Sequence, residues 1–460
     1  MANAKLVRIG CAAGFADDRC DSGLPVVEAL IAAGGPAYMM YEVLGERTLA
    51  LAQLLRREDP DKGYSPYMVD FLRPVLKRCV ESNIPIVANF GASNPVAAAK
   101  LVMGLAHELQ LPKLRVGVVE GDDLLGILGP ELIRTWQTEE GLLLEGQDIL
   151  AANVYLGARP IAQALAMGAE VVITGRCSDS ALALGPLLHE FGWAEDDWTK
   201  KAVGILAGHL LECCGHVSGG YFADPGVKDV PDLEELGFPI AEISSEGDIV
   251  ITKPAGTGGL VSERTVKEQL LYEIHDPANY LTPDVTLDIT NVVVSQEGPN
   301  RVRVSGAAGR PRPPTDKVTV SIAGGYLGEG EISYAGPNAL ARAELAVRVL
   351  RQRVVKLGIK EPVRCDIIGT IAVFDGDKAD LRSAETFPAD GDYRVRMAGQ
   401  SLDRAIASRI AREVLGLYAN GPAGGAGVRI NVTNRVKTAS CYVETSLANP
   451  KISLMDYNHG

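Results

Sequence analysis

The strongest constraint on the fold is an alternation of strand-like runs and helical patterns over the first 280 residues. The strand-like runs are short, apolar and mostly β-branched, and a glycine or polar turn follows each: Leu6–Cys11, Ile84–Asn89, Arg115–Glu120, Val171–Thr174 and Asp248–Thr252. The helical patterns between them include Pro25–Ala33, Tyr67–Asn83, Pro95–Gln110, Arg159–Met167 and Val203–Cys214. Because this alternation is typical of βαβ units with right-handed crossovers, it predicts an α/β fold with a mainly parallel sheet and flanking helices.

The pattern changes after residue 280. From about Thr282 the segments TLDITNVVVSQ, NRVRVSG and KVTVSIAGG are rich in β-formers and are separated by loops. Later elements are expected at Leu340–Leu357 (helix), Arg364–Ala372 (strand), Leu402–Tyr418 (helix) and Arg429–Thr433 (strand). We therefore predict an α/β domain over residues 1–280 and a mixed α+β domain over residues 281–460.

The charge balance argues against two classes of partner. The 460-residue chain has 45 Lys plus Arg against 58 Asp plus Glu, which gives a formal net charge of -13. Such a chain has no general attraction for nucleic-acid phosphates or for anionic lipid. We expect neither nucleic acid nor membrane as a partner.

Cysteine usage and the N-terminal residues indicate the compartment. The eight cysteines are scattered along a long chain, as is usual for reduced thiols. The opening residues MANAKLVRIGCAAG lack a long apolar segment, and nowhere do 18 uncharged apolar residues run together. We expect a soluble cytoplasmic protein.

Polar, glycine-containing loops follow the predicted strands. Ligands of open parallel sheets bind at the carboxyl ends of the strands, so these loops are the first place to look for a site. They are Cys11–Arg19, Asn89–Pro95, Glu120–Asp123, Gly175–Ser180 and Lys253–Gly259. We expect four of them, all but Glu120–Asp123, to converge on one pocket. For each single Asp or Asn, capping of the following helix is the plainer alternative.

The candidate residues come mostly from these loops. The candidates for catalysis are Asp17, Asp18, Asp179 and His216. The candidates for substrate binding are Arg19, Asn89, Asn94, Arg176, Ser178, Lys253, Gly256, Thr257 and Gly258.

The segment KPAGTGGLVSERTVKEQLL predicts a strand end, a glycine turn and a helix from about Ser262. The N–H groups of Gly256 and Gly258 could cradle an anion beside Lys253. A tight turn that needs positive φ is the alternative. The segment lacks the P-loop spacing, and no GxGxxG follows a strand in the N-terminal half, which disfavours a nucleotide hydrolase or a Rossmann dehydrogenase.

The segment GHLLECCGHVSGG contains His209, Cys213, Cys214 and His216. His209 and Cys213 share a helix face, but structural zinc sites usually have two separated pairs of ligands, so we predict no metal ion and no cofactor. His216 lies in a glycine loop after the helix. Its imidazole suits proton transfer near neutral pH, although a structural loop histidine is the alternative.

Several segments together resemble the acyclic terpene utilisation (AtuA) family. They are GFADDR, LGERTLALAQLLRREDPDKGY, IPIVANFGASNP, VVITGRCSDSALALGPL, GHVSGGYFADPG, KPAGTGGLVSERTVKEQLLYEI and YANGPAGGAG, and they span about Arg8–Gly427. The resemblance implies bacterial breakdown of acyclic terpenes and other branched acids through coenzyme A esters. By motif it points to Asp17, Asp18, Arg19, Asn89, Asn94, Arg176, Asp179, His216, Lys253 and Thr257, without fixing a role for any of them.

The residue types favour proton transfer beside a carbonyl. We expect a hydratase, dehydratase or isomerase that acts on a branched or unsaturated carboxylate or acyl-CoA. An Asp or His216 would remove the α-proton, while Arg176, Lys253 or loop N–H groups would hold the enolate or carboxylate. A non-catalytic CoA-ester-binding or assembly subunit is one alternative. A thioester or lactone hydrolase is another, although the chain has no GxSxG nucleophile elbow.

The last residues bear on assembly. Members of the family often continue into a small ferredoxin-like domain, which this chain lacks or which a separate small chain supplies. The tail ASCYVETSLANPKISLMDY mixes apolar side chains into a segment that frays unless something holds it. We therefore predict a homo-oligomer, with a small ferredoxin-like subunit as a further option. The alternative is a monomer whose tail folds back on its own domain.

Overall fold

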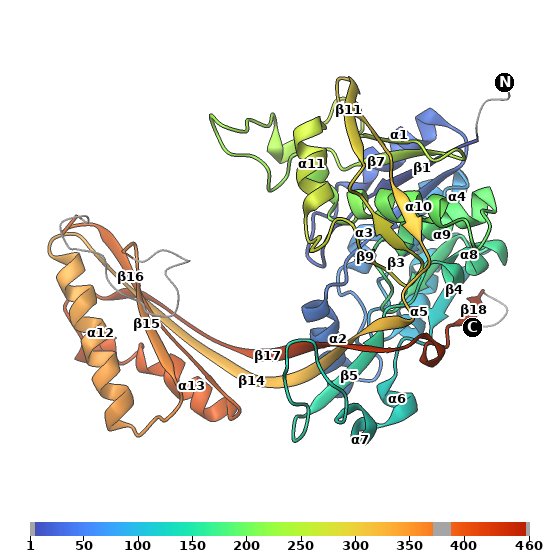
Figure 1. The fold of residues 1–460 in the computed structure, drawn as a ribbon. Coiled ribbons are helices and arrows are strands. Elements are labelled where there is room, and N and C mark those ends of the chain that lie inside the picture. The colour runs from blue at the N-terminus through green and yellow to red at the C-terminus, as the bar shows by residue number, and fades with distance from the viewer. Residues whose placement is uncertain (1–4, 371–387, 457–460) are drawn as a thin grey trace. The chain divides into compact units, whose positions relative to one another are not determined.

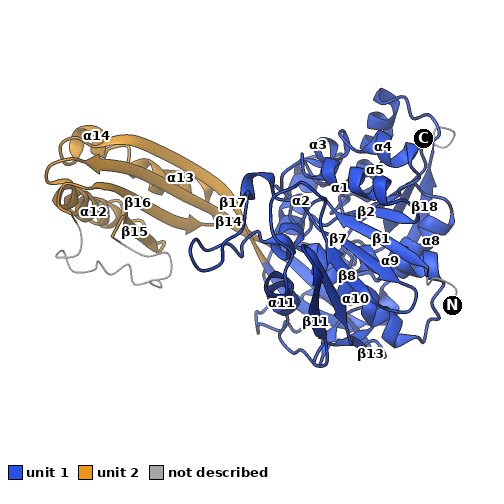
Figure 2. Ribbon diagram, turned by 90° about the horizontal axis from the view of Figure 1, so that it is seen from above, with its two compact units in different colours: residues 1–322, 438–460 blue, residues 323–437 orange. Residues whose placement is uncertain are grey.

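The computed structural model describes residues 5–370 and 388–456. They form two compact units (Figure 2). Unit 1 contains residues 1–322 and 438–460, and unit 2 contains residues 323–437. The boundary between the units therefore does not fall at residue 280, where the sequence pattern changes.

Unit 1 is built on one large mixed sheet (Figure 1), whose strand order is β11-β12-β8-β7-β1-β2-β3-β6-β4-β18. The five parallel strands at its centre are β1 (Leu6–Cys11), β2 (Ala37–Tyr41), β3 (Ile86–Ala88), β6 (Val171–Thr174) and β4 (Val116–Glu120). The antiparallel strands on its flanks are β7 (Ile240–Ser244), β8 (Ile249–Thr252), β12 (Arg301–Ser305), β11 (Val293–Gly298) and β18 (Lys451–Met455). The predicted α/β class is confirmed.

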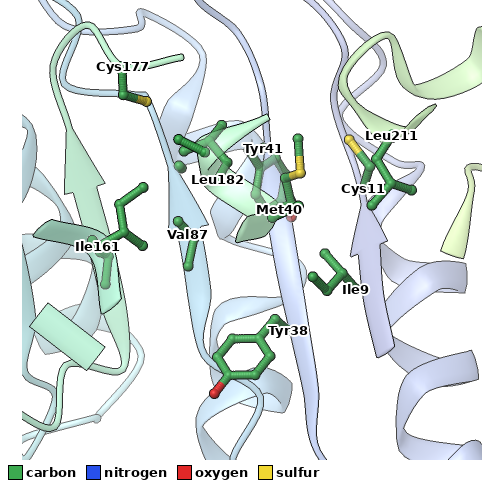
Figure 3. Close-up of a cluster of buried hydrophobic side chains, with 14 of the residues drawn as sticks. Ile9, Cys11, Tyr38, Met40, Tyr41, Val87, Ile161, Cys177, Leu182 and Leu211 are labelled. Carbon is green, nitrogen blue, oxygen red and sulfur yellow. The ribbon is translucent and has the colours of Figure 1, made fainter. Parts of the chain in front are cut away.

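Helices cover both faces of this sheet, as its continuous apolar strands require. On one face lie α1 (Gly23–Ala33) and α5 (Pro95–Glu108), and on the other α8 (Arg159–Ala166), α9 (Ala181–Phe191) and α10 (Trp198–Glu212) (Figure 2). Figure 3 shows part of the core, in which Ile9, Met40 and Val87 of the strands lie among Ile161, Leu182 and Leu211 of the helices.

The other helices of unit 1 are short or peripheral. They are α2 (Glu46–Glu58), α3 (Met68–Leu72), α4 (Leu76–Glu81), α6 (Leu125–Leu128), α7 (Pro130–Ile133), α11 (Glu263–Leu271), and the 3-10 turns η1 (Cys214–Ser218) and η2 (Leu233–Glu235). The helix predicted at Tyr67–Asn83 is divided into α3 and α4, because Pro74 has no N–H to continue the hydrogen-bond ladder. Within the described residues, no helix is both long enough and apolar enough to cross a membrane.

The β-rich stretch after Thr282 stays with unit 1. Its hairpin β11–β12 adds directly to β8 at one side of the large sheet. The remaining short strands form a three-stranded sheet of β9 (Tyr280–Leu281), β10 (Thr286–Asp288) and β13 (Ala308–Arg310). Antiparallel pairing begins earlier, at β7 and β8, and the β-rich stretch continues it within unit 1.

Unit 2 is an α+β arrangement. Its sheet has the order β15-β16-β14-β17, with β15 (Val363–Ile368), β16 (Asp392–Ser401), β14 (Thr315–Ala335) and β17 (Ala426–Glu444). Helices α12 (Ala339–Lys356), α13 (Arg404–Glu413) and α14 (Leu417–Asn420) complete it. Its separate core includes Ile332, Val395 and Leu350. The end of the strand predicted at Arg364–Ala372 lies outside the described residues.

Strands β14 and β17 each contain residues of both units. The part of β14 in unit 1 pairs with β5 (Ile149–Val154), from Val318 opposite Val154 to Ile322 opposite Ile149. The chain therefore passes from one unit to the other within a strand both times, first within β14 and again within β17.

The tail has a fixed place in unit 1. Strand β18 pairs antiparallel with β4, from Lys451 opposite Glu120 to Met455 opposite Val116. The premise that the tail lacks a partner within the chain is thus wrong, because β4 offers it an open sheet edge. The homo-oligomer stays a prediction, now without that support.

Removing β18 should destabilise unit 1. A chain that ends after Ala448 loses the pairing with β4 and the packing of Ile452 and Leu454 against the core. We expect its melting temperature to fall by at least about 4 °C, and the exposed edge of β4 to promote aggregation. Thermal unfolding with light scattering measures both. A chain that ends after Asp456 keeps β18 and serves as the control; equal behaviour of the two chains would contradict the prediction.

Candidate functional site

The carboxyl ends of the parallel strands meet at one edge of the large sheet, here called the rim. Strand β8 reaches the same edge, because β7 is antiparallel to both β1 and β8 and Ile240 pairs with both Gly10 and Thr252. The four loops expected to converge therefore all begin at this edge: Cys11–Arg19, Asn89–Pro95, Gly175–Ser180 and Lys253–Gly259.

Arg176 lies buried in the loop after β6 and is 1% exposed. Its guanidinium donates to the main-chain oxygens of Cys177 and Leu44 and forms an ion pair with Asp179. Its Cζ lies 4.4 Å from the centre of the Tyr155 ring. Since its donors are directed at protein groups, Arg176 positions Asp179, and a direct contact with substrate does not fit this geometry.

Asp179 shares its surroundings with Glu42. The Asp179 side chain is 35% exposed, so it is accessible to solvent although its partner Arg176 is not. Glu42 is 8% exposed and accepts hydrogen bonds from Asn89 Nδ2 (2.9 Å) and Leu44 N (2.8 Å). Burial and the charge of Asp179 raise the pKa of Glu42, and burial raises the pKa of Asp179 against the effect of Arg176. The pair therefore retains a proton more readily than free carboxylates do.

Glu42 is absent from the sequence-based candidates. It follows β2, whose sequence AYMMY has no β-branched residue and was not among the predicted strands. Asn89, which was predicted, uses its whole carboxamide here: Nδ2 donates to Glu42, and Oδ1 accepts from the N–H of Val43 (2.8 Å). Its observed role is to shape the loop after β2.

A second group on the same side surrounds Tyr155. Its hydroxyl donates to Glu46 (2.6 Å), which also pairs with Lys317 (3.1 Å). The ring has Arg176 and Lys317 within cation–π distance. Burial alone would raise the pKa of Glu46, but the Tyr155 hydroxyl and Lys317 lower it to about 2. No motif in the sequence indicates this group, because its members come from three distant segments.

His216 is half-buried between two tyrosines. Its ring stacks on Tyr221 at 5.2 Å and meets Tyr272 edge-on at 5.1 Å. Burial lowers the pKa of His216, so its imidazole is neutral near pH 7 and can accept a proton.

The two predicted catalytic aspartates of the loop after β1, Asp17 and Asp18, have different surroundings. Asp18 accepts hydrogen bonds from the N–H groups of Gly14 (2.9 Å) and Arg19 (2.8 Å), and burial raises its pKa. It therefore fixes the loop after β1. Asp17 is exposed.

Backbone strain collects around His216. Among the described residues, five that are not Gly, Asn or Asp have positive φ, and three of these are Cys214, Tyr221 and Glu273. Cys214 belongs to the same 3-10 turn as His216, Tyr221 stacks on its ring, and Glu273 follows Tyr272. Such conformations cost about 1–3 kcal/mol each and tend to gather at functional sites.

A buried polar group lies next to His216 and consists of His209, Glu212 and Gln269. His209 Nδ1 is 2.8 Å from Glu212 Oε1, and its Nε2 is 3.3 Å from the main-chain oxygen of Leu270. Gln269 Nε2 donates to the main-chain oxygen of His209 (2.9 Å). Burial alone would lower the pKa of His209, but the charge of Glu212 and the hydrogen bond to it raise that pKa. His209 is thus paired with Glu212, and not with Cys213 as a zinc ligand.

Two glycines allow α10 to approach the rim closely. A Cβ on Gly208 would lie 2.6 Å from the Cα of Ser180, and one on Gly14 would lie 2.6 Å from the carbonyl carbon of Cys213. Helix α10 is therefore in contact with the start of α9 and with the loop after β1. Glu212, one turn after Gly208, lies on the helix face that meets Ser180 and the adjoining Asp179.

The Lys253–Gly259 loop is a closed turn. Lys253 Nζ donates to the main-chain oxygen of Thr257 (2.6 Å), and burial lowers the pKa of Lys253. The N–H groups of Gly258 and Gly259 donate hydrogen bonds to the main-chain oxygens of Glu235 and Pro231, respectively. Gly256 has φ +77°. Of the donors predicted for an anion cradle, the N–H of Gly258 and the ammonium group of Lys253 are directed at protein oxygens, which favours the alternative of a tight turn.

Three other candidates have structural partners. Asn94 caps α5 by accepting from Ala97 N (3.3 Å) and donates to two main-chain oxygens of the loop before Gly63, so the capping alternative holds. Arg19 donates to the main-chain oxygens of Glu234 and Leu236, both at 2.9 Å. Ser178 Oγ lies 3.2 Å from Ser180 Oγ.

Two further findings concern ligands. A cavity of about 550 Å³ lies apart from the candidate residues and is lined by residues such as Arg159, Trp193, Trp198, Lys201 and Asp284. Within the part of the chain that the structure describes, no group of three or more His, Cys, Asp or Glu side chains is arranged to hold a metal ion. That the protein needs neither metal nor cofactor stays a prediction.

Comparison with known protein families gives a match over most of the chain. The model of the family described as "Acyclic terpene utilisation family protein AtuA" matches residues 7–454. No curated protein matches the chain. The matched range includes the rim and both compact units, and the resemblance noted in the sequence is confirmed.

Substitution of Gly208 by Ala should disturb the approach of α10 to α9. The added Cβ would meet backbone atoms of Ser180, which cannot rotate away, so we expect the free energy of unfolding to fall by about 1–3 kcal/mol. Urea denaturation measures this. Gly104→Ala is the matched control, because that helical position has open space; it should raise the free energy of unfolding by up to about 1 kcal/mol. A neutral Gly208→Ala would contradict the close contact.

Glu46→Gln should make stability less dependent on acid pH. The pKa of Glu46 is lower in the folded than in the unfolded chain, so its charge stabilises the fold above about pH 4.5, and that stabilisation is lost as the pH falls toward about 2. We expect the variant to be less stable than the native chain at pH 7, with a difference that shrinks below pH 4.5. Urea denaturation from pH 7 to pH 3 tests this. Glu58→Gln, at an exposed position of the same helix, should show no such trend; a constant Glu46→Gln difference would refute the assignment.

Proposed function

The chain belongs to the acyclic terpene utilisation family, whose name implies a catabolic role, and from this premise we propose that it is an enzyme of proton transfer. Its reaction would be hydration and dehydration, or isomerisation, of a branched or unsaturated acyl compound. The substrate would enter at the rim, where Asp179 is accessible to solvent.

The observation that supports this most is the ion pair between Asp179, which solvent reaches, and the buried Arg176, with Glu42 near enough for the charge of Asp179 to raise the pKa of Glu42. Two carboxylates that interact in this way retain one proton between them at a pH where isolated carboxylates would have lost it. A group that still carries a proton can act as a general acid. Arg176 keeps Asp179 in place during the exchange.

His216 supplies the complementary base. With its pKa lowered by burial, the neutral imidazole can take a proton from the carbon next to the carbonyl group. In dehydration, the Glu42–Asp179 pair would give its proton to the departing hydroxyl group, which leaves as water. Hydration is the same sequence reversed, so the proton balance closes without an oxidant or reductant.

Hydrolysis of a thioester or lactone has less support. Burial raises the pKa of the Cys213 thiol, which disfavours the thiolate that a nucleophile requires. The Ser178 hydroxyl is next to Ser180, and no histidine is recorded as its partner among the described residues. A binding subunit without turnover is the alternative that the following experiment distinguishes.

Asp179→Asn should abolish most proton transfer. We expect dehydration of a branched β-hydroxyacyl thioester, followed by NMR, to fall by at least about 100-fold, because the acid that protonates the departing hydroxyl group is lost while the shape of the side chain is kept. His216→Gln should instead slow exchange of the α-proton in D2O, because it removes the proposed base.

The control is Asp21→Asn, which changes an exposed aspartate just after the loop Cys11–Arg19. It should leave both rates within about two-fold of the native values, since an exposed side chain outside the proposed mechanism can change with little effect. Dehydration that survives in Asp179→Asn would contradict the proposed role of Asp179. Binding of the thioester by the native protein without any exchange would favour the binding subunit.

A further inference from the structure

The two compact units have net charges of opposite sign. Unit 2 contains 17 Lys plus Arg against 13 Asp plus Glu, which gives a formal net charge of +4. Unit 1 contains 28 Lys plus Arg against 45 Asp plus Glu, which gives -17. The acidity of the whole chain therefore hides a basic part. Opposite charges on one chain can attract one copy of the protein to another.

The positive charge of unit 2 is concentrated on its helices. Helices α12 and α13 both pack on β16, and the ion pair between Arg353 and Glu413 (2.9 Å) joins them. The exposed cations of these helices and of the residues just after α12 are Arg348, Arg351, Lys356, Lys360, Arg404, Arg409 and Arg412. The acidic residues of the same two segments are Glu344, Asp403 and Glu413. The helices thus present a strongly basic surface.

A groove of about 300 Å³ runs along α12 within this surface. Its lining residues are Arg348, Val349, Gln352, Arg353 and Lys356. Whereas Arg353 is paired with Glu413, Arg348 and Lys356 have no ion-pair partner among the described residues. Val355, which adjoins the groove, is 74% exposed, and Leu345, one turn before Arg348, is 42% exposed. The groove therefore combines unpaired cations with uncovered apolar side chains.

Unit 1 has a segment of complementary chemistry before β7. This segment, residues 224–235, is here called the acidic loop, and it extends from unit 1 next to α11 (Figure 1). Its exposed carboxylates are Asp224, Asp229, Asp232, Glu234 and Glu235. Within the described part of the chain none of them has an ion-pair partner, and the cation of the loop, Lys228, is paired with Glu268. Val227 and Leu233 are 66% and 41% exposed. The loop therefore carries uncompensated negative charge beside apolar side chains.

From this complementarity, we infer that the acidic loop of one copy docks along α12 of a second copy, with its carboxylates on Arg348 and Lys356 and its apolar side chains against Val355 and Leu345. Each copy has one groove and one acidic loop, so two copies can make the same contact twice, most simply as a two-fold dimer. The inference goes beyond the proposed function and does not depend on it, because none of these residues belongs to the proposed mechanism.

The first test is sedimentation equilibrium of the full-length native protein at 0.15 M and at 1 M NaCl. At 0.15 M we expect a dimer of twice the 48.8 kDa mass of the chain. At 1 M the Debye length falls to about 3 Å, so association should weaken at least about tenfold. A monomer at every protein concentration, or a dimer whose affinity is independent of salt, would overturn the inference without any variant.

Charge reversal then tests the two surfaces. Arg348→Glu with Lys356→Glu should weaken self-association at least about tenfold, because the groove then repels the loop. Asp232→Lys with Glu235→Lys should have the same effect from the other side. A chain with all four substitutions should associate at least about threefold more tightly than either double variant, because the reversed groove meets a reversed loop. All four positions are exposed, so we expect the variants to fold.

The matched control is Arg429→Glu with Arg435→Glu. These exposed residues belong to β17, outside the helices, and their substitution changes the net charge of unit 2 by the same amount. Self-association should stay within about two-fold of the native value. Equal weakening by this control, a dimer that survives reversal of the groove, or a fourfold variant no better than the double variants would show that the acidic loop does not occupy the groove.

Discussion

The buried guanidinium of Arg176 is the interaction on which the rim depends. A charge with 1% exposure is stable only when its donors are satisfied, and here they reach the loop after β2, its own loop and Asp179. Its main-chain N–H donates to Asp122 (3.0 Å), a carboxylate that also accepts from Asn153 (2.8 Å) and whose pKa burial raises to about 6. Removing the guanidinium would thus release the loop after β2 and the loop Gly175–Ser180 together.

The sequence predicted the scaffold better than the site. Strands β1 and β6 begin and end where expected, because their β-branched residues are buried on both sides in a parallel sheet. Strand β2 was missed, since AYMMY is buried by its position between two strands and carries no β-branched residue, and Glu42 was missed with it. Asp179 and His216 are among the sequence-based candidates because each belongs to a glycine-containing loop directly after a strand or helix.

The remaining site residues depend on contacts between distant segments. Tyr155, Glu46 and Lys317 meet only through tertiary structure, and no spacing in the sequence relates them. The same holds for Glu212 and Gln269, which read as ordinary residues of amphipathic helices. Conversely, Lys253, Arg19 and Asn94 have the composition of ligand-binding loops, yet their donors are turned to main-chain oxygens. Residue type indicates what a side chain can bind, whereas its neighbours decide what it does bind.

The insertion of unit 2 within unit 1 has a consequence for biosynthesis. Strand β4 leaves the ribosome early, but its outer neighbour β18 is made only after the whole of unit 2. During synthesis the edge of β4 and the apolar residues beside it stay uncovered, and such edges invite pairing with other chains. The nascent protein therefore passes through a long interval in which unit 2 can close on its own core while the larger unit waits for its last strand, so the edge of β4 needs protection from other chains until the last strand is made.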